Sequence, residues 1–179
     1  MPEEYELQGV IFTEEQIAAK AIEIAAEISR DYKGRHVVMV GVLKGAVMWM
    51  SELLKRLDQD LDVSIDFMAV ASYGMDTKTS GVVKINKDLD WSVDGKHVIL
   101  VEDILDSGVT LEYLVKYLGS KNPASVSSCV LLDKPSGRKV DVEADYVGFV
   151  VDDIFIVGYG LDVAQKYRNL PFITSVKTE

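Results

Sequence analysis

The chain has 179 residues, of which 48% are hydrophobic and 27% charged, and its formal net charge at pH 7 is −10. This length and composition predict one soluble globular domain over residues 1–179, with no apolar run near the ~20 residues that span a bilayer. The acidic balance, without a cluster of lysine and arginine, argues against a nucleic-acid partner. A single cysteine and an acidic N-terminus without a signal-peptide pattern favour a cytoplasmic protein.

The first predicted element is a helix that begins after Thr13 and ends near Lys33. Thr13 and Gln16 have the spacing of a capping box. Apolar residues then recur with helical spacing at Ile17, Ala21, Ile24 and Ile28.

Strands and helices alternate along the rest of the chain. The predicted strands are 36–43, 63–71, 96–103, 125–133 and 146–151, and the predicted helices are 45–57 and 110–119. Continuous apolar strands between amphipathic helices are typical of a parallel sheet that is covered on both faces. We therefore predict an α/β fold, a parallel twisted sheet with helices on both faces.

The polar segment SYGMDTKTSGVVKINKDLD (72–90) interrupts this alternation. It contains glycine and is flanked by short strand-like stretches. Long loops in compact domains are usually functional or disordered, so we interpret 72–90 as a lid or a long excursion.

The segment VILVEDILDSGVTL (98–111) carries the strongest functional signal. Its apolar strand ends in Glu102 and Asp103, and the turn DSGVT (106–110) leads directly into a helix. A helix N-terminus attracts phosphate, Gly108 lets the backbone approach a ligand, and acids at a strand end can bind a hydrated cation or sugar hydroxyls. The alternative is a simple turn in which Thr110 caps the helix.

This segment resembles the phosphoribosyl-pyrophosphate fingerprint of type I phosphoribosyltransferases, an apolar strand with two acids followed by D-S-G-x-T. The resemblance extends from about Ile11 to Ile173 and narrows to the hypoxanthine-guanine phosphoribosyltransferases. It implies purine salvage: the 5-phosphoribosyl group of phosphoribosyl pyrophosphate passes to a 6-oxopurine, giving a nucleoside 5′-monophosphate and pyrophosphate. The resemblance also implies a Mg²⁺ cofactor, a homodimer or homotetramer, and a hood built from the N-terminal segment and about 134–179.

Site residues follow from the same resemblance. The phosphoribosyl- and 5′-phosphate-binding residues would be Glu102, Asp103, Asp106, Ser107, Gly108, Val109 and Thr110. The pyrophosphate-binding residues would be Leu43, Lys44, Gly45 and Arg168, with a cis Leu43–Lys44 peptide. Lid residues would be Ser72 and Tyr73, base-binding residues Lys134, Phe155, Ile156 and Asp162, and metal-binding residues Glu102, Asp103 and Asp162. No role is assigned to Met75, Asp76 and Thr77.

A mechanism is implied by these residues. Asp106 would accept or guide the proton that the purine loses as its nitrogen attacks the ribose. The Lys134 ammonium only donates hydrogen bonds, so it would favour a 6-oxo group over the amino group of adenine.

Several alternatives stay open. Taken singly, Lys134 fits a solvated loop lysine, Phe155 a core aromatic and Arg168 a surface ion-pair partner. At the level of function, the alternatives are a xanthine-preferring or other type I phosphoribosyltransferase, a non-enzymatic RNA-binding regulator with the same fold, and a signalling receiver domain.

Overall fold

The computed structural model describes residues 5–73 and 82–177, which form two sheets and three α-helices. The strands are β1 (Leu7–Phe12), β2 (Val37–Leu43), β3 (Val63–Tyr73), β4 (Val82–Lys87), β5 (His97–Leu105), β6 (Ser125–Asp133), β7 (Tyr146–Val150), β8 (Ile156–Val157) and β9 (Ile173–Val176). The helices are α1 (Glu14–Asp31), α2 (Val47–Leu54) and α3 (Val109–Gly119), with the short 3₁₀ helix η1 (Pro135–Gly137).

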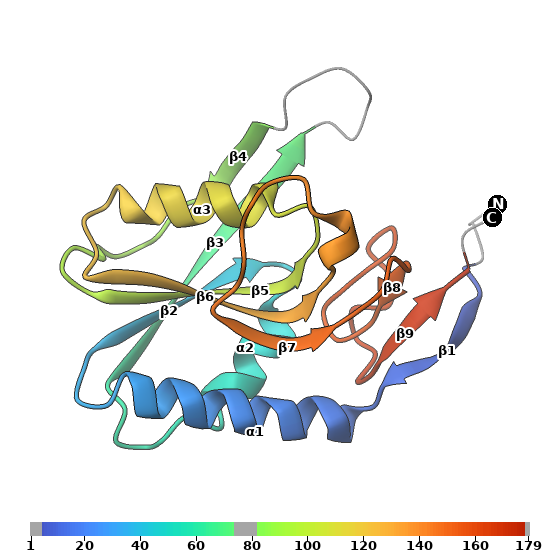
Figure 1. The fold of residues 1–179 in the computed structure, drawn as a ribbon, viewed down its shortest axis with the longest axis horizontal. Helices are drawn as coiled ribbons and strands as arrows, with labels where there is room; N and C mark the ends of the chain where they lie inside the picture. Colours follow the sequence, from blue (N-terminus) through green and yellow to red (C-terminus); the bar gives the residue numbers. More distant parts are fainter. Residues whose placement is uncertain (1–4, 74–81, 178–179) are drawn as a thin grey trace.

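The large sheet has the strand order β4-β3-β2-β5-β6-β7. The strands from β3 to β7 in this order run parallel, and only the edge strand β4 is antiparallel to its neighbour. Helices α1 and α2 cover one face and α3 the other (Figure 1). The predicted fold class is confirmed.

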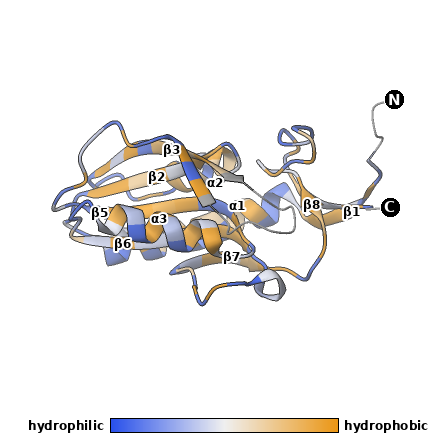
Figure 2. Ribbon diagram, turned by 90° about the horizontal axis from the view of Figure 1, so that it is seen from above, coloured by the Kyte–Doolittle hydropathy of each residue, from blue (hydrophilic) through white to orange (hydrophobic). Residues whose placement is uncertain are grey.

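Alternate residues of the central strands pack into two separate hydrophobic cores, one on each face of the sheet. In β2, Val37 and Met39 pack with α1 and α2, whereas Val38 and Val40 pack with α3. Figure 2 shows the resulting hydrophobic colour along the central strands. Because both faces of each strand are buried, these strands lack the polar alternation of a half-exposed sheet.

The element boundaries differ from the predicted ones by a few residues. Strand β5 continues to Leu105 instead of ending at residue 103, because its ladder with β6 extends to the pair Leu105–Asp133. Helix α2 is shorter than predicted, since residues 44–46 form the turn that precedes it and the helix ends at Leu54. The capping box is confirmed: Gln16 N lies 3.2 Å from Thr13 Oγ1, and Thr13 N lies 2.9 Å from Gln16 Oε1.

The small sheet joins both ends of the described chain in the order β1-β9-β8, at the end of the molecule opposite the loops that precede β2 and β6 (Figure 1). Its strands are antiparallel, and Thr174 Oγ1 donates to the Gly9 carbonyl across 2.6 Å. None of these three strands was predicted from sequence. Strand β1 is mostly exposed and its partner lies at the other end of the chain, so it has no clear local pattern.

Strands occupy part of the predicted lid: residues 72–73 end β3, and residues 82–87 form β4. Strand β3 extends to Tyr73, and its last residues pair with the start of β4. Residues 74–81, including Met75, Asp76 and Thr77, lie outside the described residues, as do the side chains of Ser72 and Tyr73.

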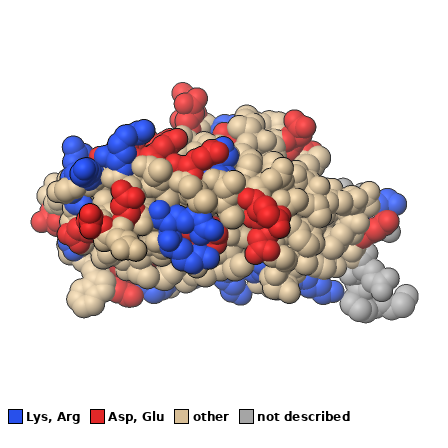
Figure 3. Space-filling model, turned by 90° about the horizontal axis from the view of Figure 1, so that it is seen from below, with Lys and Arg blue, Asp and Glu red and all other residues tan. Residues whose placement is uncertain are grey.

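Two further observations concern possible partners. Within residues 5–73 and 82–177, no helix is long and apolar enough to cross a membrane. On the face seen in Figure 3, lysine and arginine side chains lie among aspartate and glutamate side chains, without a broad basic area. This face lacks the continuous positive surface that phosphate backbones require.

Candidate functional site

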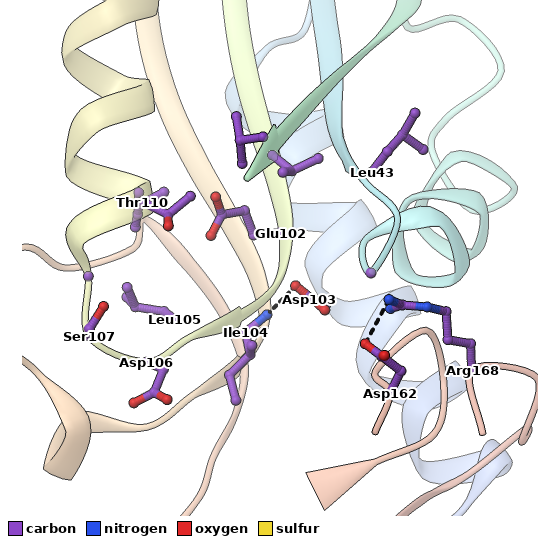
Figure 4. Close-up of a pocket in the computed structure, with 15 residues that line it drawn as sticks. Leu43, Glu102, Asp103, Ile104, Leu105, Asp106, Ser107, Thr110, Asp162 and Arg168 are labelled. Carbon is purple, nitrogen blue, oxygen red and sulfur yellow. Dashed lines mark hydrogen bonds and ion pairs between the residues drawn. The ribbon is translucent and has the colours of Figure 1, made fainter. Parts of the chain in front are cut away.

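A cavity of about 410 Å³ lies beyond the carboxyl ends of β2 and β5 (Figure 4). Three segments that are distant in sequence form its walls: the end of β2, the end of β5 with the turn into α3, and residues 162–168. The predicted site residues in its lining are Leu43, Gly45, Glu102, Asp103, Asp106, Ser107, Gly108, Thr110, Asp162 and Arg168. Parallel α/β sheets bind ligands at this edge.

Apolar side chains complete the lining and were not predicted. They are Val42, Val70, Ile104, Leu105 and Leu111. In sequence these residues are indistinguishable from the rest of the core, because they continue the apolar strands or the apolar face of α3.

The turn into α3 has the form of an anion site. Gly108 is the N-cap of α3 with φ +82°, and no side chain caps the helix. Among the first-turn amides, Val109 N makes a long hydrogen bond of 3.4 Å to Ser107 Oγ, which a ligand can replace. The dipole of α3 favours negative charge at this end of the helix. The alternative role of Thr110 as the helix cap is wrong, because the cap is Gly108.

Gly108 also has a packing role that was not predicted. A side chain at this position would press against Arg138 and Val140, each 3.0 Å from the place of its Cβ. Positive φ and this contact both require glycine.

Glu102 is a buried acid with one carboxyl oxygen that has no hydrogen-bond partner among the described residues. Its residue is 5% exposed, and its Oε1 contacts no donor among the described residues. Burial, with a smaller contribution from the neighbouring Asp103, raises the pKa of Glu102 to about 8. Figure 4 shows its carboxyl group directed toward the first turn of α3 and Thr110. An unpaired buried acid is costly, and such groups cluster at binding sites.

Asp103 faces the opposite wall of the cavity. Burial raises its pKa, although its own backbone amide and that of Ile104, 3.0 Å from Oδ1, partly offset the effect. A Cβ on Gly45 would collide with the Asp103 carboxylate. The turn after β2 thus lies directly against Asp103 because residue 45 has no side chain.

Arg168 reaches this wall from the C-terminal part of the chain. Its guanidinium lies 2.7 Å from Asp162 Oδ1 and donates to the Gly160 carbonyl across 2.6 Å. Figure 4 shows the guanidinium on the Asp103 side of the cavity. Arg168 is therefore not a surface ion-pair partner, since its pair with Asp162 is part of the cavity wall.

Lys44 stands at the rim, after a cis Leu43–Lys44 peptide as expected. Its ammonium donates to Gln165 Oε1 across 3.1 Å, and the same oxygen lies 3.4 Å from Arg168 Nη2. Sequence analysis missed Gln165. It lies 121 positions from Lys44, in a segment without regular structure, and no motif marks it.

Of the predicted base-binding residues, Asp162 lines the cavity, whereas Lys134, Phe155 and Ile156 are not among its lining residues. Lys134 follows β6, and its backbone amide donates to the Leu105 carbonyl across 2.9 Å. Its ammonium is 2.8 Å from Asp153, a second residue that sequence analysis missed. Phe155 is 46% exposed and is therefore not a core aromatic, whereas Ile156 is buried in β8.

The predicted metal ligands do not form a three-carboxylate centre. No group of three or more His, Cys, Asp or Glu residues in the described part of the chain is placed to hold a metal ion. Asp162 is paired with Arg168, on the opposite side of the cavity from Glu102 (Figure 4). The free Glu102 oxygen and the Asp103 carboxylate fit a divalent cation that takes most of its ligands from a bound substrate.

Asp106 is exposed and lies at the cavity edge, between the acids and the turn. Its carboxylate lies against Gly137, where any Cβ would collide with Oδ1. The site thus combines an anion-binding turn, the buried acid Glu102, the half-buried acid Asp103, two cations and one accessible carboxylate.

Comparison with known proteins relates this arrangement to characterised ones. The family model described as "Phosphoribosyl transferase domain" matches residues 8–164. The hypoxanthine-guanine phosphoribosyltransferase of Bacillus subtilis is 49% identical over 173 residues, covering 97% of this chain and 95% of that protein. A crystal structure of a hypoxanthine-guanine phosphoribosyltransferase from Bacillus anthracis has a TM-score of 0.90 at 45% identity, covering 97% of this chain and 100% of that one.

One group of relatives is much longer. The "Bifunctional protein TilS/HprT" of Listeria monocytogenes is 51% identical over 174 residues, but the match covers only 26% of that protein. The chain therefore corresponds to about a quarter of those bifunctional relatives and to nearly the whole of the Bacillus proteins.

Proposed function

Because the chain belongs to the phosphoribosyltransferase family, we propose that it transfers the 5-phosphoribosyl group of phosphoribosyl pyrophosphate to a 6-oxopurine, hypoxanthine or guanine. One observation carries the proposal: the N-terminus of α3, which has no side-chain cap, and the neighbouring acids Glu102 and Asp103 face one cavity. A 5′-phosphate would bind at the helix N-terminus, and ribose hydroxyls would donate to the two acids. The products are the nucleoside 5′-monophosphate and pyrophosphate.

The phosphoribosyl group is held from two sides. The 5′-phosphate accepts hydrogen bonds from the amides of residues 106–110 and from the Ser107 and Thr110 hydroxyls. Glu102 and Asp103 accept from the ribose hydroxyls. Positive charge develops on the ribose ring as the bond to pyrophosphate breaks, and nearby carboxylates stabilise it.

Pyrophosphate lies at the opposite wall. The backbone of Leu43, Lys44 and Gly45 and the Arg168 guanidinium bind its oxygens. Mg²⁺, when bound, neutralises charge on the leaving group. Glu102, Asp103 and Asp162 would hold this ion, directly or through water.

The purine enters between Asp106 and the hood, which we assign to the small sheet and residues 134–177. The accessible Asp106 carboxylate accepts the proton that the purine loses as its nitrogen attacks the anomeric carbon. Lys134 donates to the 6-oxo group, exposed Phe155 stacks on the ring, and the Ile156 backbone contacts its edge. Residues Ser72 and Tyr73 begin the segment that excludes water during transfer.

The resemblance to these relatives also supports a cytoplasmic homodimer or homotetramer. Exposed apolar side chains such as Ile65 and Val47 are available for contact with a second copy. A preference for xanthine, or another base of the same class, is the second candidate, because the residues that read the purine edge are largely backbone.

A direct assay tests the function. Purified protein, phosphoribosyl pyrophosphate and Mg²⁺ are combined with hypoxanthine, guanine, xanthine or adenine, and pyrophosphate release is followed. Nucleotide formation with hypoxanthine or guanine, and little with adenine, is expected. Transfer to none of the four bases, with salt-sensitive RNA binding, would favour the regulator; transfer to xanthine alone would replace the substrate.

A further inference from the structure

The loop that carries Lys134 is joined to the strand end that carries Asp106. Two backbone hydrogen bonds connect them: Lys134 N donates to the Leu105 carbonyl across 2.9 Å, and Lys139 N donates to the Ser107 carbonyl across 2.8 Å. Asp106 lies between these two connections. The residue proposed to recognise the base, Lys134, and the residue proposed to accept the proton, Asp106, are therefore held by the same connection between loop and strand end.

Arg138 occupies the centre of this support. Its Nη1 donates to the Asp106 carbonyl across 2.6 Å and to the Leu105 carbonyl across 3.2 Å. Its Nη2 lies 2.5 Å from Asp133 Oδ1, and the two side chains are only 18% and 17% exposed. A guanidinium presents several donors in a fixed plane, so one side chain can hold both carbonyls and the carboxylate.

The Arg138 side chain also lies against the turn into α3. Its aliphatic stem runs beneath the anion-binding turn, with Cδ 3.0 Å from the place of a Cβ on Gly108. Next to it, Gly137 lies directly against the Asp106 carboxylate. Asp133 ends β6 and pairs with Leu105 in the ladder, so the anchor of Arg138 belongs to the rigid sheet.

We propose that Arg138 is a positioning residue for the transfer reaction: anchored by Asp133, it fixes the Asp106 backbone and thereby the direction of the Asp106 carboxylate. The inference rests on the proposed function and assigns Arg138 no contact with substrate. Arg138 acts through Asp106, and it holds that carboxylate at a constant distance from Lys134. A misplacement of about 1 Å in such a group can lower a rate by ~10²-fold.

The test is a double-mutant cycle with Arg138→Lys and Asp106→Asn. Lysine keeps the charge but cannot donate to both carbonyls and Asp133 in one plane. We expect kcat of Arg138→Lys to fall roughly 10- to 100-fold, with the Kd for phosphoribosyl pyrophosphate changed less than about threefold. In the Asp106→Asn background the same change should lower kcat little, because the group that Arg138 positions is already lost.

Two controls separate positioning from folding. Arg56→Lys alters another half-buried arginine, paired with Glu52 across 2.7 Å on α2, and should leave kcat unchanged. Asp133→Asn keeps Arg138 but weakens its anchor by removing the carboxylate charge, and it should lower kcat in the same direction as Arg138→Lys. If circular dichroism shows that Arg138→Lys is not folded, the same double-mutant cycle with Asp106→Asn is measured with Asp133→Asn.

Several outcomes would overturn the inference. They are an unchanged kcat in Arg138→Lys, an equal loss in both Asp106 backgrounds, or a parallel loss of kcat and phosphoribosyl pyrophosphate affinity. Absence of transfer in the wild-type protein would instead reject the proposed function. The two failures are therefore distinguishable.

Discussion

Lys134 and Asp153 form an ion pair, with Lys134 Nζ 2.8 Å from Asp153 Oδ1. The lysine side chain is 13% exposed and the aspartate 73% exposed, so a solvent-facing carboxylate holds a largely buried ammonium. If Lys134 reads the purine as proposed, Asp153 holds its ammonium in place before a base binds. A 6-oxo group would share this ammonium, whereas an amino group would have no acceptor on it.

Lys134→Gln should narrow the gap between 6-oxopurines and adenine. Glutamine can still donate, but it also offers an acceptor for the adenine amino group. We expect kcat/KM for hypoxanthine and guanine to fall. The loss of transition-state stabilisation should be at most a few kcal/mol, and the affinity for phosphoribosyl pyrophosphate should be nearly unchanged. Asp153→Asn, which keeps Lys134, is the matched control and should preserve the order of the bases. Equal losses for all three bases would show that Lys134 supports the fold.

Asp106→Asn should separate chemistry from binding. The amide has nearly the same shape but cannot accept the purine proton at neutral pH. Loss of a general base typically lowers kcat by ~10²–10⁴-fold, and the Kd for phosphoribosyl pyrophosphate should change little. Steady-state rates and equilibrium binding measure the two quantities. A near-normal kcat would reduce Asp106 to a turn residue.

Gln165→Glu should weaken the binding of pyrophosphate. The Gln165 amide oxygen lies between Lys44 and Arg168 without neutralising either cation. A carboxylate there would compete with pyrophosphate for both charges, so its Kd should rise by about tenfold or more. Gln16→Glu makes the same chemical change in the capping box of α1, where glutamate also fits, and should leave the Kd unchanged. Calorimetric titration with pyrophosphate measures both variants. Equal affinity in Gln165→Glu and wild type would contradict the arrangement.

Glu102→Gln should change how stability depends on pH in metal-free buffer. The folded protein raises the pKa of Glu102 from 4.5 to about 8, so between these values the folded state binds more protons than the unfolded state. Its free energy of unfolding therefore falls as pH rises through this window. Glutamine carries no charge, so the variant lacks this loss. The free energy of unfolding of the variant minus that of the wild type should therefore be larger at pH 8 than at pH 5. Urea unfolding in EDTA at both values measures this gain.

Glu23→Gln, at an exposed position of α1, controls for the loss of one acidic charge. A stability difference between Glu102→Gln and wild type that is the same at pH 5 and pH 8 would show that Glu102 is not held protonated by burial.

Local sequence patterns determined much of this protein. The Thr13 capping box, the apolar strands and the D-S-G-x-T turn are read over a few neighbouring residues, and they correctly indicated α1, the parallel sheet and the family. These features depend on local backbone geometry and on which side chains are buried. The periodicity of apolar residues that results is visible in a short stretch of sequence.

Only the tertiary structure decided how distant segments meet. The small sheet pairs β1 with β9, Gln165 contacts Lys44, and Arg138 reaches the Asp106 carbonyl, each across a long stretch of chain. A sequence pattern cannot rank such contacts, because their free energies depend on burial and orientation that exist only after the sheet has formed. For the same reason the sequence indicated a carboxylate at position 102, but only the folded site showed that it is buried, with its Oε1 unpaired among the residues that the structure describes.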